Sequence, residues 1–444
     1  VIAQVGGIVA RRALELTQPG DTILLLAGKG HNGDDVRAMA NHLPERDVSL
    51  LSIADPAKIL PNLATSLEPR PALVVDGLFG IGLNRVLDAD WMQVISQLNA
   101  NRLRVLSVDV PSGVDAATGE IQGAAIRAEE TLTFGAPKTG LLHSAAADYV
   151  GRLTVAPEIG LVPRTATSEL QLGQAEDFIG FPPPRPAGGH KSTFGHVGIM
   201  AGSLGYHGAA VLAARGATRA QPGLVTLLTP EEVFVPVASQ LQSVMVQPLV
   251  PGEITIKSIT TLLVGPGMAS DRLPDDLKTT ADSMWHESSV PMVVDASAHD
   301  WLTAGAVPEK SIRVITPHPG EAARLLGTTP AEVQADRVEA LQALSAKFGN
   351  CHVVLKGRHT LIGKAEGTVH VNATGNPALA QGGSGDLLAG YLAGLLAQPL
   401  LQDNVGLAIR FAVWQHGAAA DALSASSSNW TIEDLANWIG GKQP

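Results

Sequence analysis

The pattern of apolar and polar positions in the first part of the chain predicts one helix followed by a series of buried strands. Residues 2–16 repeat apolar side chains at helical spacing, so we expect an amphipathic helix there. Residues 23–27 are continuously apolar, as in a strand that is buried on both faces. Shorter β-rich runs, separated by segments long enough for helices, follow at residues 48–53, 72–75, 105–108 and 131–134. This alternation predicts a doubly wound α/β domain with a parallel sheet.

A second series of strands predicts another α/β domain in the C-terminal half. These strands are expected at residues 196–200, 224–228, 261–264, 292–294, 314–315, 353–355 and 368–371. Between the two series the periodicity decays, and the proline-rich run 181–186 is typical of a stiff connector. We therefore predict domains at residues 1–165 and 187–444, with a linker at residues 166–186.

Polar residues follow several strands of the first series. The glycine-rich segment 28–35 comes after the strand at 23–27, a nucleotide-binding arrangement in Rossmann-like sheets, although its spacing matches neither the dinucleotide fingerprint nor a Walker loop. Ligands of such sheets bind outside the carboxyl ends of the strands, so we expect one rim to carry Asn32, Asp76, Asp109 and Ser112. Their oxygens suit a hard cation, although any single Asp could instead cap a loop.

The turn at residues 383–386 is the strongest candidate for chemistry. Gly383, Ser384 and Gly385 allow close approach of the backbone, and the apolar positions that follow recur at helical spacing. Amides at a helix start suit a phosphate or an oxyanion. Asp386 in the same turn could take a proton from a hydroxyl that attacks a phosphoryl group. The alternative is a glycine-rich turn in which Asp386 caps the helix.

Composition narrows the class of protein. The formal net charge is −11 and no dense Lys/Arg run is present, which argues against nucleic-acid and membrane-surface partners. The single cysteine, Cys351, allows no internal disulfide framework, fits the reducing cytoplasm and precedes an apolar run, so we expect a buried thiol. Neither a membrane-spanning segment nor a signal peptide is expected.

The motifs of the N-terminal half resemble those of NAD(P)H-hydrate epimerase domains. The resemblance is carried by residues 28–35, 76–82, 109–113 and 135–138. It implies that the hydrated dinucleotide binds to the loop residues His31, Asn32, Gly33, Asp34 and Asp35. It also implies that Asp109 faces the substrate and that potassium is held by Asn32, Asp76 and Ser112.

The first loop departs from the family pattern. The family usually has Asn-Asn-Gly-Gly-Asp-Gly, whereas this chain has His-Asn-Gly-Asp-Asp-Val at residues 31–36. Asp34 in place of glycine removes conformational freedom and adds negative charge beside a diphosphate, which predicts weaker anion binding. A second hypothesis is therefore that the N-terminal half is a non-catalytic dinucleotide-binding or interaction module.

The C-terminal half, from His190 to about Gly440, resembles ADP-dependent NAD(P)H-hydrate dehydratases, which are ribokinase-like α/β sandwiches. The motifs are Thr-Pro-His-Pro-Gly-Glu at 316–321, Leu-Lys-Gly at 355–357 and Asn-Pro-x-x-Ala-x-Gly-Gly-Ser-Gly-Asp at 376–386. The resemblance implies that Asp386 is the catalytic base and that an anion hole is formed by Gly383, Ser384 and Gly385. The adenine nucleotide would contact Gly385 together with Lys356, Gly357, Arg358, His359 and Thr360.

The same resemblance places the hydrate against Ala209, Gly267 and His318, with magnesium accompanying the phosphates of ADP. Two alternatives remain open from the residues alone. His318, between two prolines, could be a rigid turn residue, and Lys356 could be a solvated lysine.

Together the two resemblances predict a bifunctional enzyme of nicotinamide cofactor repair. We expect ADP-dependent dehydration of (S)-NAD(P)H-hydrate to NAD(P)H, with release of AMP and phosphate, and epimerisation of the R and S hydrates by the N-terminal domain. Expected ligands are NAD(P)H-hydrate, ADP, Mg²⁺ and K⁺, and a homo-oligomer is expected. The rival hypothesis is a ribokinase-like small-alcohol kinase that carries a non-catalytic N-terminal module.

Overall fold

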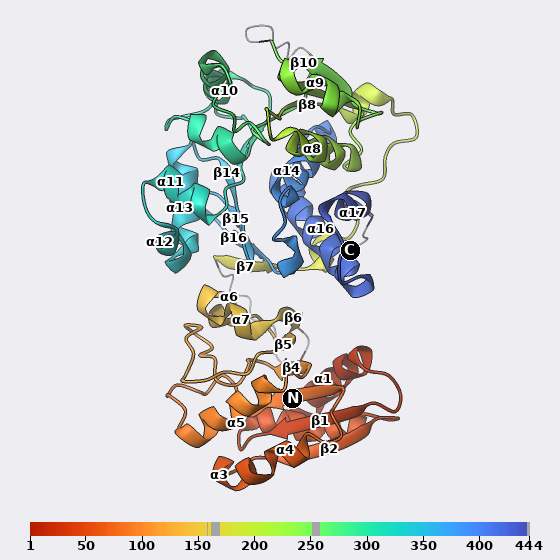
Figure 1. The fold of residues 1–444 in the computed structure, drawn as a ribbon, viewed down its shortest axis with the longest axis vertical. Coiled ribbons are helices and arrows are strands. Elements are labelled where there is room, and N and C mark those ends of the chain that lie inside the picture. Colours follow the sequence, from red (N-terminus) through yellow and green to blue (C-terminus); the bar gives the residue numbers. More distant parts are fainter. Residues whose placement is uncertain (158, 161–168, 251–257, 442–444) are drawn as a thin grey trace. The chain divides into compact units, whose positions relative to one another are not determined.

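The protein is described by a computed structural model for residues 1–157, 159–160, 169–250 and 258–441 (Figure 1). The chain divides into two compact units, Val1–Ala166 and Thr167–Pro444. Each unit contains a parallel or mostly parallel sheet covered by helices, as the alternation of predicted strands and helices requires.

The first unit has a six-stranded parallel sheet, which confirms the predicted doubly wound domain. The strand order is β2-β1-β3-β4-β5-β6, so the order reverses between β1 and β3. Ligands of such sheets bind outside the carboxyl ends at this reversal. The strands are β1 Thr22–Ala27, β2 Asp47–Ser52, β3 Leu73–Gly77, β4 Val105–Val108, β5 Glu130–Phe134 and β6 Arg152–Ala156.

Helices cover both faces of this sheet, which explains why the first strand is apolar throughout. Ile23 and Leu25 of β1 pack in the core beneath α1, whereas Leu24 and Leu26 pack in the core beneath α5. The predicted helix at residues 2–16 is confirmed. The helices of this unit are α1 Ile2–Leu16, α2 His31–Met39, α3 Pro56–Ile59, α4 Leu63–Ser66, α5 Ala89–Ala100, α6 Thr139–Leu142 and α7 Ala147–Val150.

The second unit has one sheet in the order β10-β9-β8-β11-β12-β13-β14-β15-β16-β7. Its strand pairs are parallel except for β14 with β15 and β15 with β16. All seven predicted strands are present, whereas β7, β10 and β15 were not predicted. The strands are β7 Leu170–Gly173, β8 His196–Met200, β9 Leu224–Thr229, β10 Met245–Pro248, β11 Thr261–Val264, β12 Met292–Val294, β13 Arg313–Ile315, β14 His352–Leu355, β15 Thr360–Gly363 and β16 Val369–Asn372.

The helix α14 is the centre of this unit. Every residue from Leu387 to Leu396 is buried, and α14 packs against α8, α16 and strands β11 and β12 (Figure 1). The helices are α8 His207–Arg219, α9 Glu231–Ala238, α10 Asp275–Glu287, α11 Pro319–Leu326, α12 Pro330–Ala335, α13 Arg337–Lys347, α14 Ser384–Leu396, α15 Pro399–Gln402, α16 Val405–Ser426 and α17 Ile432–Trp438.

Short 3-10 helices connect several of these elements. They are η1 Ala40–His42, η2 Leu60–Asn62 and η3 Ser144–Ala146 in the first unit, and η4 Ala175–Phe178, η5 Lys191–Phe194, η6 Ala296–Trp301 and η7 Pro377–Leu379 in the second. No helix in the described ranges is both long and apolar enough to cross a membrane.

The segment 166–186, predicted as a linker, differs in the structure. Residues 166–168 lie outside the described residues, but β7 pairs in parallel with β16 at the edge of the second sheet. Phe178 is 1% exposed, and its ring centroid lies 5.6 Å from that of Phe411. The described part of the segment therefore belongs to the second unit. Proline-rich composition misled the prediction, because prolines are also compatible with an edge of a packed domain.

The contact between α8 and α14 generates a stability prediction. A Cβ added at Gly390 would lie 1.9 Å from the carbonyl oxygen of Ala213, which is a backbone atom that cannot rotate away. We expect Gly390→Ala to lower the free energy of unfolding by about 1–3 kcal/mol, because the helices must separate. Gly406→Ala in α16 is the matched control, since nothing lies within 4 Å of an added Cβ there. Chemical denaturation of both variants checks this, and equal stabilities would contradict it.

Candidate active site

The glycine-rich turn opens α14, as the sequence predicts. Gly383 is the N-cap residue and has φ +94°, a left-handed conformation that favours glycine. The first amides of the helix have no partner within the helix. Of these, the Ser384 amide donates to the carbonyl of Gln381 at 3.3 Å, and the Leu387 amide is the first to bond back, to the carbonyl of Gly383 at 3.0 Å. The turn therefore combines N–H donors with the positive end of the helix dipole, which suits an anion.

A buried ion pair lies against this turn. Lys356 Nζ donates to Asp295 Oδ1 at 2.8 Å, and the two side chains are 19% and 2% exposed. A Cβ added at Gly385 would lie 3.2 Å from Lys356 Nζ and 4.0 Å from Asp295 Oδ2. The structure thus brings together the end of β14, the end of β12 and the start of α14. The alternative that Lys356 is a solvated lysine is wrong.

Asp386 stands in the first turn of α14, next to this pair. Burial raises the pKa of Asp386 to about 6, the negative charge of Asp295 adds to the rise, and Lys356 opposes it. Such a carboxylate is ionised at neutral pH and is still basic enough to accept a proton from a hydroxyl. The N-cap position belongs to Gly383, so Asp386 is not the cap of the helix.

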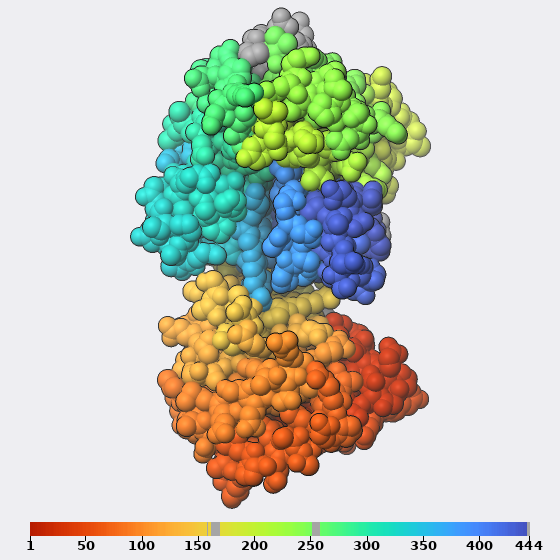
Figure 2. Space-filling view, viewed as in Figure 1, coloured from red at the N-terminus to blue at the C-terminus, as the bar shows by residue number. Residues whose placement is uncertain are grey.

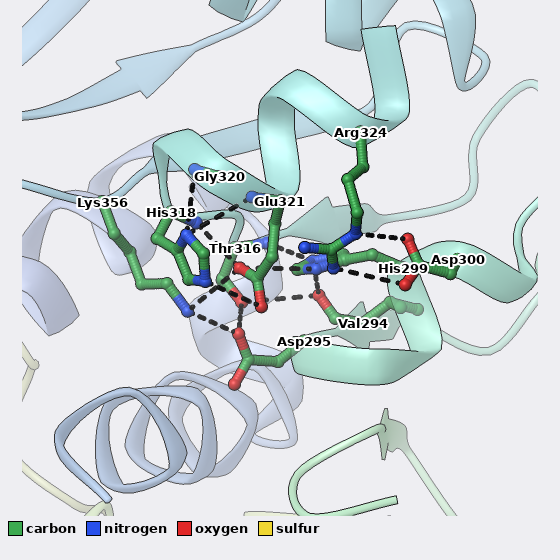
Figure 3. Close-up of polar contacts among 10 residues, drawn as sticks. All are labelled: Val294, Asp295, His299, Asp300, Thr316, His318, Gly320, Glu321, Arg324 and Lys356. Atoms are coloured by element: carbon green, nitrogen blue, oxygen red, sulfur yellow. Dashed lines mark hydrogen bonds and ion pairs between the residues drawn. The ribbon is translucent and has the colours of Figure 1, made fainter. Parts of the chain in front are cut away.

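Glu321 connects two histidines to the ion pair (Figure 3). Its Oε2 lies 3.8 Å from Lys356 Nζ and 3.7 Å from His299 Nδ1. His299 is fully buried and its Nε2 donates to the carbonyl of Val294 at 3.0 Å. Burial lowers the pKa of His299, so the imidazole is neutral. Burial also lowers the pKa of Lys356, but Asp295 and Glu321 outweigh it, so that its pKa is raised and the ammonium stays charged.

His318 caps helix α11. Its Nδ1 accepts hydrogen bonds from the amides of Gly320, at 3.0 Å, and Glu321, at 3.3 Å. The Glu321 carboxylate in turn accepts from the His318 amide at 2.8 Å. The sequence alternative of a rigid turn residue is therefore supported. The imidazole is 53% exposed, and its contact with substrate stays a prediction.

Two further predicted substrate residues lie side by side. Gly267 has φ +65°, and an added Cβ would lie 2.7 Å from the Cβ of Ala209 and 2.5 Å from the carbonyl oxygen of Tyr206. Ser203 Oγ donates to the Gly267 carbonyl at 2.7 Å and fixes this turn. Figure 2 shows that the visible face of the second unit is hollowed between the cyan segment and the blue helices.

The predicted nucleotide loop has a tightly shaped backbone. Gly357 has φ +135° and His359 has φ +52°, and Thr360 Oγ1 donates to the Gly357 carbonyl at 2.9 Å. His359 is 8% exposed. The loop ends where β15 begins at Thr360. Contacts of Gly357, Arg358, His359 and Thr360 with a nucleotide stay predictions.

Sequence reasoning missed several residues of this site. Thr316 Oγ1 donates to Asp295 Oδ1 at 2.6 Å, and Ser384 Oγ lies 3.4 Å from Nε2 of the buried His416. Burial lowers the pKa of His416 to about 4, so it is neutral. Thr316 and Glu321 lie within the motif at 316–321, which was a usable signal. No local pattern marked His299 and His416, and Asp295 was noticed but given no role.

In the first unit the predicted rim residues also meet. Asp76 is fully buried and accepts from Ser107 Oγ at 2.9 Å, from Ser112 Oγ at 2.6 Å and from the Ser112 amide at 2.9 Å. Asn32 Nδ2 donates to the carbonyl of Phe79 at 2.7 Å, and Asn32 Oδ1 is buried without a partner among the described residues. An orphaned carbonyl oxygen beside the Phe79 carbonyl is a donor set that suits a hard cation.

Asp109 lies on the same rim and is held by Lys138. Asp109 has φ +66°, and its Oδ1 accepts from Lys138 Nζ and, at 3.1 Å, from Thr133 Oγ1. Burial raises the pKa of Asp35 to about 6, and the charge of Asp109 adds to the rise. The two carboxylates are therefore close enough to influence each other. No role was predicted for Lys138, although it lies in the motif at residues 135–138.

The first loop is shorter than predicted. The helix α2 begins at His31, so residues 31–35 are its first turns and only residues 28–30 form a loop. An added Cβ at Gly33 would lie 2.1 Å from the Gly28 carbonyl oxygen, so a side chain at position 33 would clash with the backbone. Asp34 does not have a positive φ and its Oδ1 accepts from Arg37 at 2.8 Å. Its predicted unfavourable charge is therefore partly offset, and its predicted loss of conformational freedom does not apply.

These features define a ribokinase-like domain in the second unit and a doubly wound α/β domain in the first. The profile of the NAD(P)H-hydrate dehydratase family matches residues 197–439, and that of the YjeF-related protein N-terminus matches residues 51–140. The chain belongs to the family of bifunctional NAD(P)H-hydrate repair enzymes.

Relatives that match most of the chain are named bifunctional NAD(P)H-hydrate repair enzymes. The bifunctional NAD(P)H-hydrate repair enzyme of Moorella thermoacetica is 35% identical over 90% of this chain and 82% of its own length. That of Coxiella burnetii is 33% identical over 94% and 88%. The crystal structure of ADP/ATP-dependent NAD(P)H-hydrate dehydratase from Bacillus subtilis, co-crystallised with ATP and Mg²⁺, is 28% identical with a TM-score of 0.55. It covers 61% of this chain and 96% of that chain.

The raised pKa of Asp386 generates a pH prediction. A general base works only when ionised, so we expect kcat/KM of the dehydration to rise with pH through about 6 and then level off. Asp386→Asn should lower kcat by about 10²–10⁴-fold and abolish this limb. Asp275→Asn, on the exposed start of α10, should keep the rate and the profile. A limb that survives in Asp386→Asn would assign the titration to another group.

Proposed function

We propose that the second unit dehydrates hydrated nicotinamide cofactors with ADP and that the first unit interconverts the two hydrate epimers. The observation that carries the proposal is Asp386, whose pKa is raised, in the first turn of α14 beside the Lys356–Asp295 pair. This arrangement supports the proposal, because phosphoryl transfer needs a base, an anion hole and a fixed cation close together.

The dehydration follows from these groups in two steps. The oxygen of the ring hydroxyl attacks the β-phosphorus of ADP while Asp386 takes the proton of that hydroxyl. The bond between the β-phosphorus and the bridging oxygen breaks, and AMP leaves with its electrons. The amides of residues 383–385 and the ammonium of Lys356 stabilise the charge on the transferred group. Phosphate is a better leaving group than hydroxide, so it departs with its bonding electrons as the ring loses a proton, which regenerates NAD(P)H.

Two cations belong to this proposal. Magnesium, when bound, neutralises phosphate charge. Glu321 fits it, because among the described residues Oε1 of Glu321 has only a long contact of 3.5 Å, with His318 Nε2. For potassium in the first unit the fitting group is the unpartnered Oδ1 of Asn32, with the Phe79 carbonyl and Ser112 beside it. Asp76 lies beside these groups, but its oxygens are occupied by protein donors.

The epimerisation is assigned to Asp109 and its neighbours. It needs no nucleotide, because the bond between the hydrated carbon and the ring nitrogen breaks as the hydroxyl loses a proton, and the same bond re-forms on the other face of the carbon. Asp109 and Asp35 are the carboxylates that can take up and return this proton, since burial raises the pKa of Asp35 to about 6 and the charge of Asp109 adds to the rise. ADP rather than ATP, a homo-oligomer and a cytoplasmic location stay predictions.

A single assay tests the combined function. A mixture of R and S NADH-hydrate, given the purified chain, ADP, Mg²⁺ and K⁺, is expected to regain the full NADH absorbance. A plateau near the fraction of one epimer would leave a working dehydratase beside an inactive first unit. No recovery together with a stable phosphoester would support the small-alcohol kinase instead, and replacing ADP by ATP would identify the preferred nucleotide.

The potassium site has its own test. We expect K⁺, but not Li⁺, to raise the Tm of the chain, because an ion that binds only the folded state stabilises it. Asn32→Leu should abolish this shift and slow epimerisation by about tenfold or more, because it removes the unpartnered oxygen. Asn84→Leu, at an exposed position, is the matched control. A K⁺-dependent shift that persists in Asn32→Leu would place the ion elsewhere.

A further inference from the structure

The guanidinium of Arg337 donates hydrogen bonds to backbone carbonyls of the predicted nucleotide loop. It is the first residue of α13, and its Nη2 donates to the carbonyls of Leu355, at 3.0 Å, and Lys356, at 3.2 Å. Its Nη1 donates to the carbonyls of Arg358 and, at 3.2 Å, His359. Four N–H groups of one guanidinium thus hold four carbonyls within a five-residue stretch.

This arrangement determines which way the loop amides point. In a trans peptide the N–H group points away from the carbonyl of the same peptide. Because the carbonyls of Lys356 and Arg358 point at Arg337, the amides of Gly357 and His359 point to the opposite side. The amide of Gly357 is therefore directed away from the guanidinium, where an anion could accept from it.

The backbone geometry of the loop depends on this contact. Gly357 and His359 both have positive φ, which is costly for His359 and needs support from its surroundings. A Cβ added at Gly357 would lie 3.2 Å from Arg337 Nη2, so the guanidinium fits closely under the loop. Among the described residues, no other side chain donates to so many carbonyls of this loop.

The charge of Arg337 also acts on the loop. Among the described residues no carboxylate forms an ion pair with Arg337. Burial lowers the pKa of Arg337 to about 10, which still leaves it protonated at neutral pH. A cation compensated only by carbonyl dipoles gives the loop a positive potential, which favours an anionic ligand.

We propose that Arg337 is a positioning residue that sets the affinity for the nucleotide by holding the loop at residues 355–360. The proposal rests on the proposed function, because that loop is the assigned nucleotide site. Lysine cannot replace Arg337, since an ammonium lacks the planar fork that reaches four carbonyls at once.

The test compares two buried arginines. Arg337→Lys is expected to raise the KM for ADP by about tenfold or more, with the KM for the hydrate changed less than about twofold. Arg313→Lys is the matched control, because Arg313 is 1% exposed and also donates only to backbone carbonyls, which are those of Met284, Trp285, Ser288, Val290 and Ile312. It should lower the Tm and leave the KM for ADP unchanged.

A rescue experiment separates positioning from general destabilisation. Arg337→Ala should recover part of its affinity for ADP when millimolar guanidinium, but not ammonium, is added. Unchanged KM for ADP in Arg337→Lys, with only a lower Tm, would overturn the proposal.

Calorimetry with ADP distinguishes this failure from failure of the proposed function. If the unmodified chain binds ADP without dehydrating the hydrate, the function is wrong and the Kd values of the Arg337 variants still decide the role of Arg337. If it binds neither ADP nor ATP, both proposals are overturned.

Discussion

The buried ion pair between Lys356 and Asp295 is the constraint on which the second unit depends. A charge with so little access to water must be paired, and the pair forms because the ends of β12 and β14, which flank β13, lie at the same edge of the sheet. Gly385 leaves room for the ammonium, because an added Cβ there would lie 3.2 Å from Lys356 Nζ. Burial raises the pKa of Asp386, and the negative charge of Asp295 adds to the rise. The ion pair therefore lies against the start of α14, orients the ammonium of Lys356 and contributes to the raised pKa of Asp386.

The first unit solves a related problem with different partners. Asp76 is also fully buried at the carboxyl end of a parallel strand, but hydroxyl and amide donors from Ser107 and Ser112 satisfy it in place of a lysine. Asp109 is held by Lys138 and Thr133. In both units the carboxyl edge of the sheet gathers carboxylates that the surrounding donors orient. This edge is where open α/β sheets bind ligands, so the fold accounts for the position of both sites.

The sequence revealed the interior of the fold better than its edges. The central strands were predictable because burial on both faces makes them continuously apolar, as in β1. The edge strands β7, which is partly buried, and β10, which is largely exposed, have no fully buried residues and carry no such signal, and β15 is a short return strand. Within the site, Gly383 and Asp386 were found because one local motif contains them. His299, His416 and Arg337 contribute through contacts across 17–32 positions of the chain, which no local pattern encodes.

The departures of the first loop from the family pattern show how such contacts change the meaning of a substitution. Val36 replaces a glycine, yet its side chain is fully buried, and an added Cβ at Gly77 would lie 2.3 Å from Val36 Cγ2. The valine therefore occupies the core against a glycine of β3 and does not reach the rim. The negative charge of Asp34 is partly offset by Arg37, which donates to Asp34 Oδ1. Nη2 of Arg37 also donates to the Gly28 carbonyl at 2.6 Å. The changes at residues 34 and 36 are therefore each accommodated by a neighbouring residue, and these two substitutions give no physical reason to expect a non-catalytic first unit.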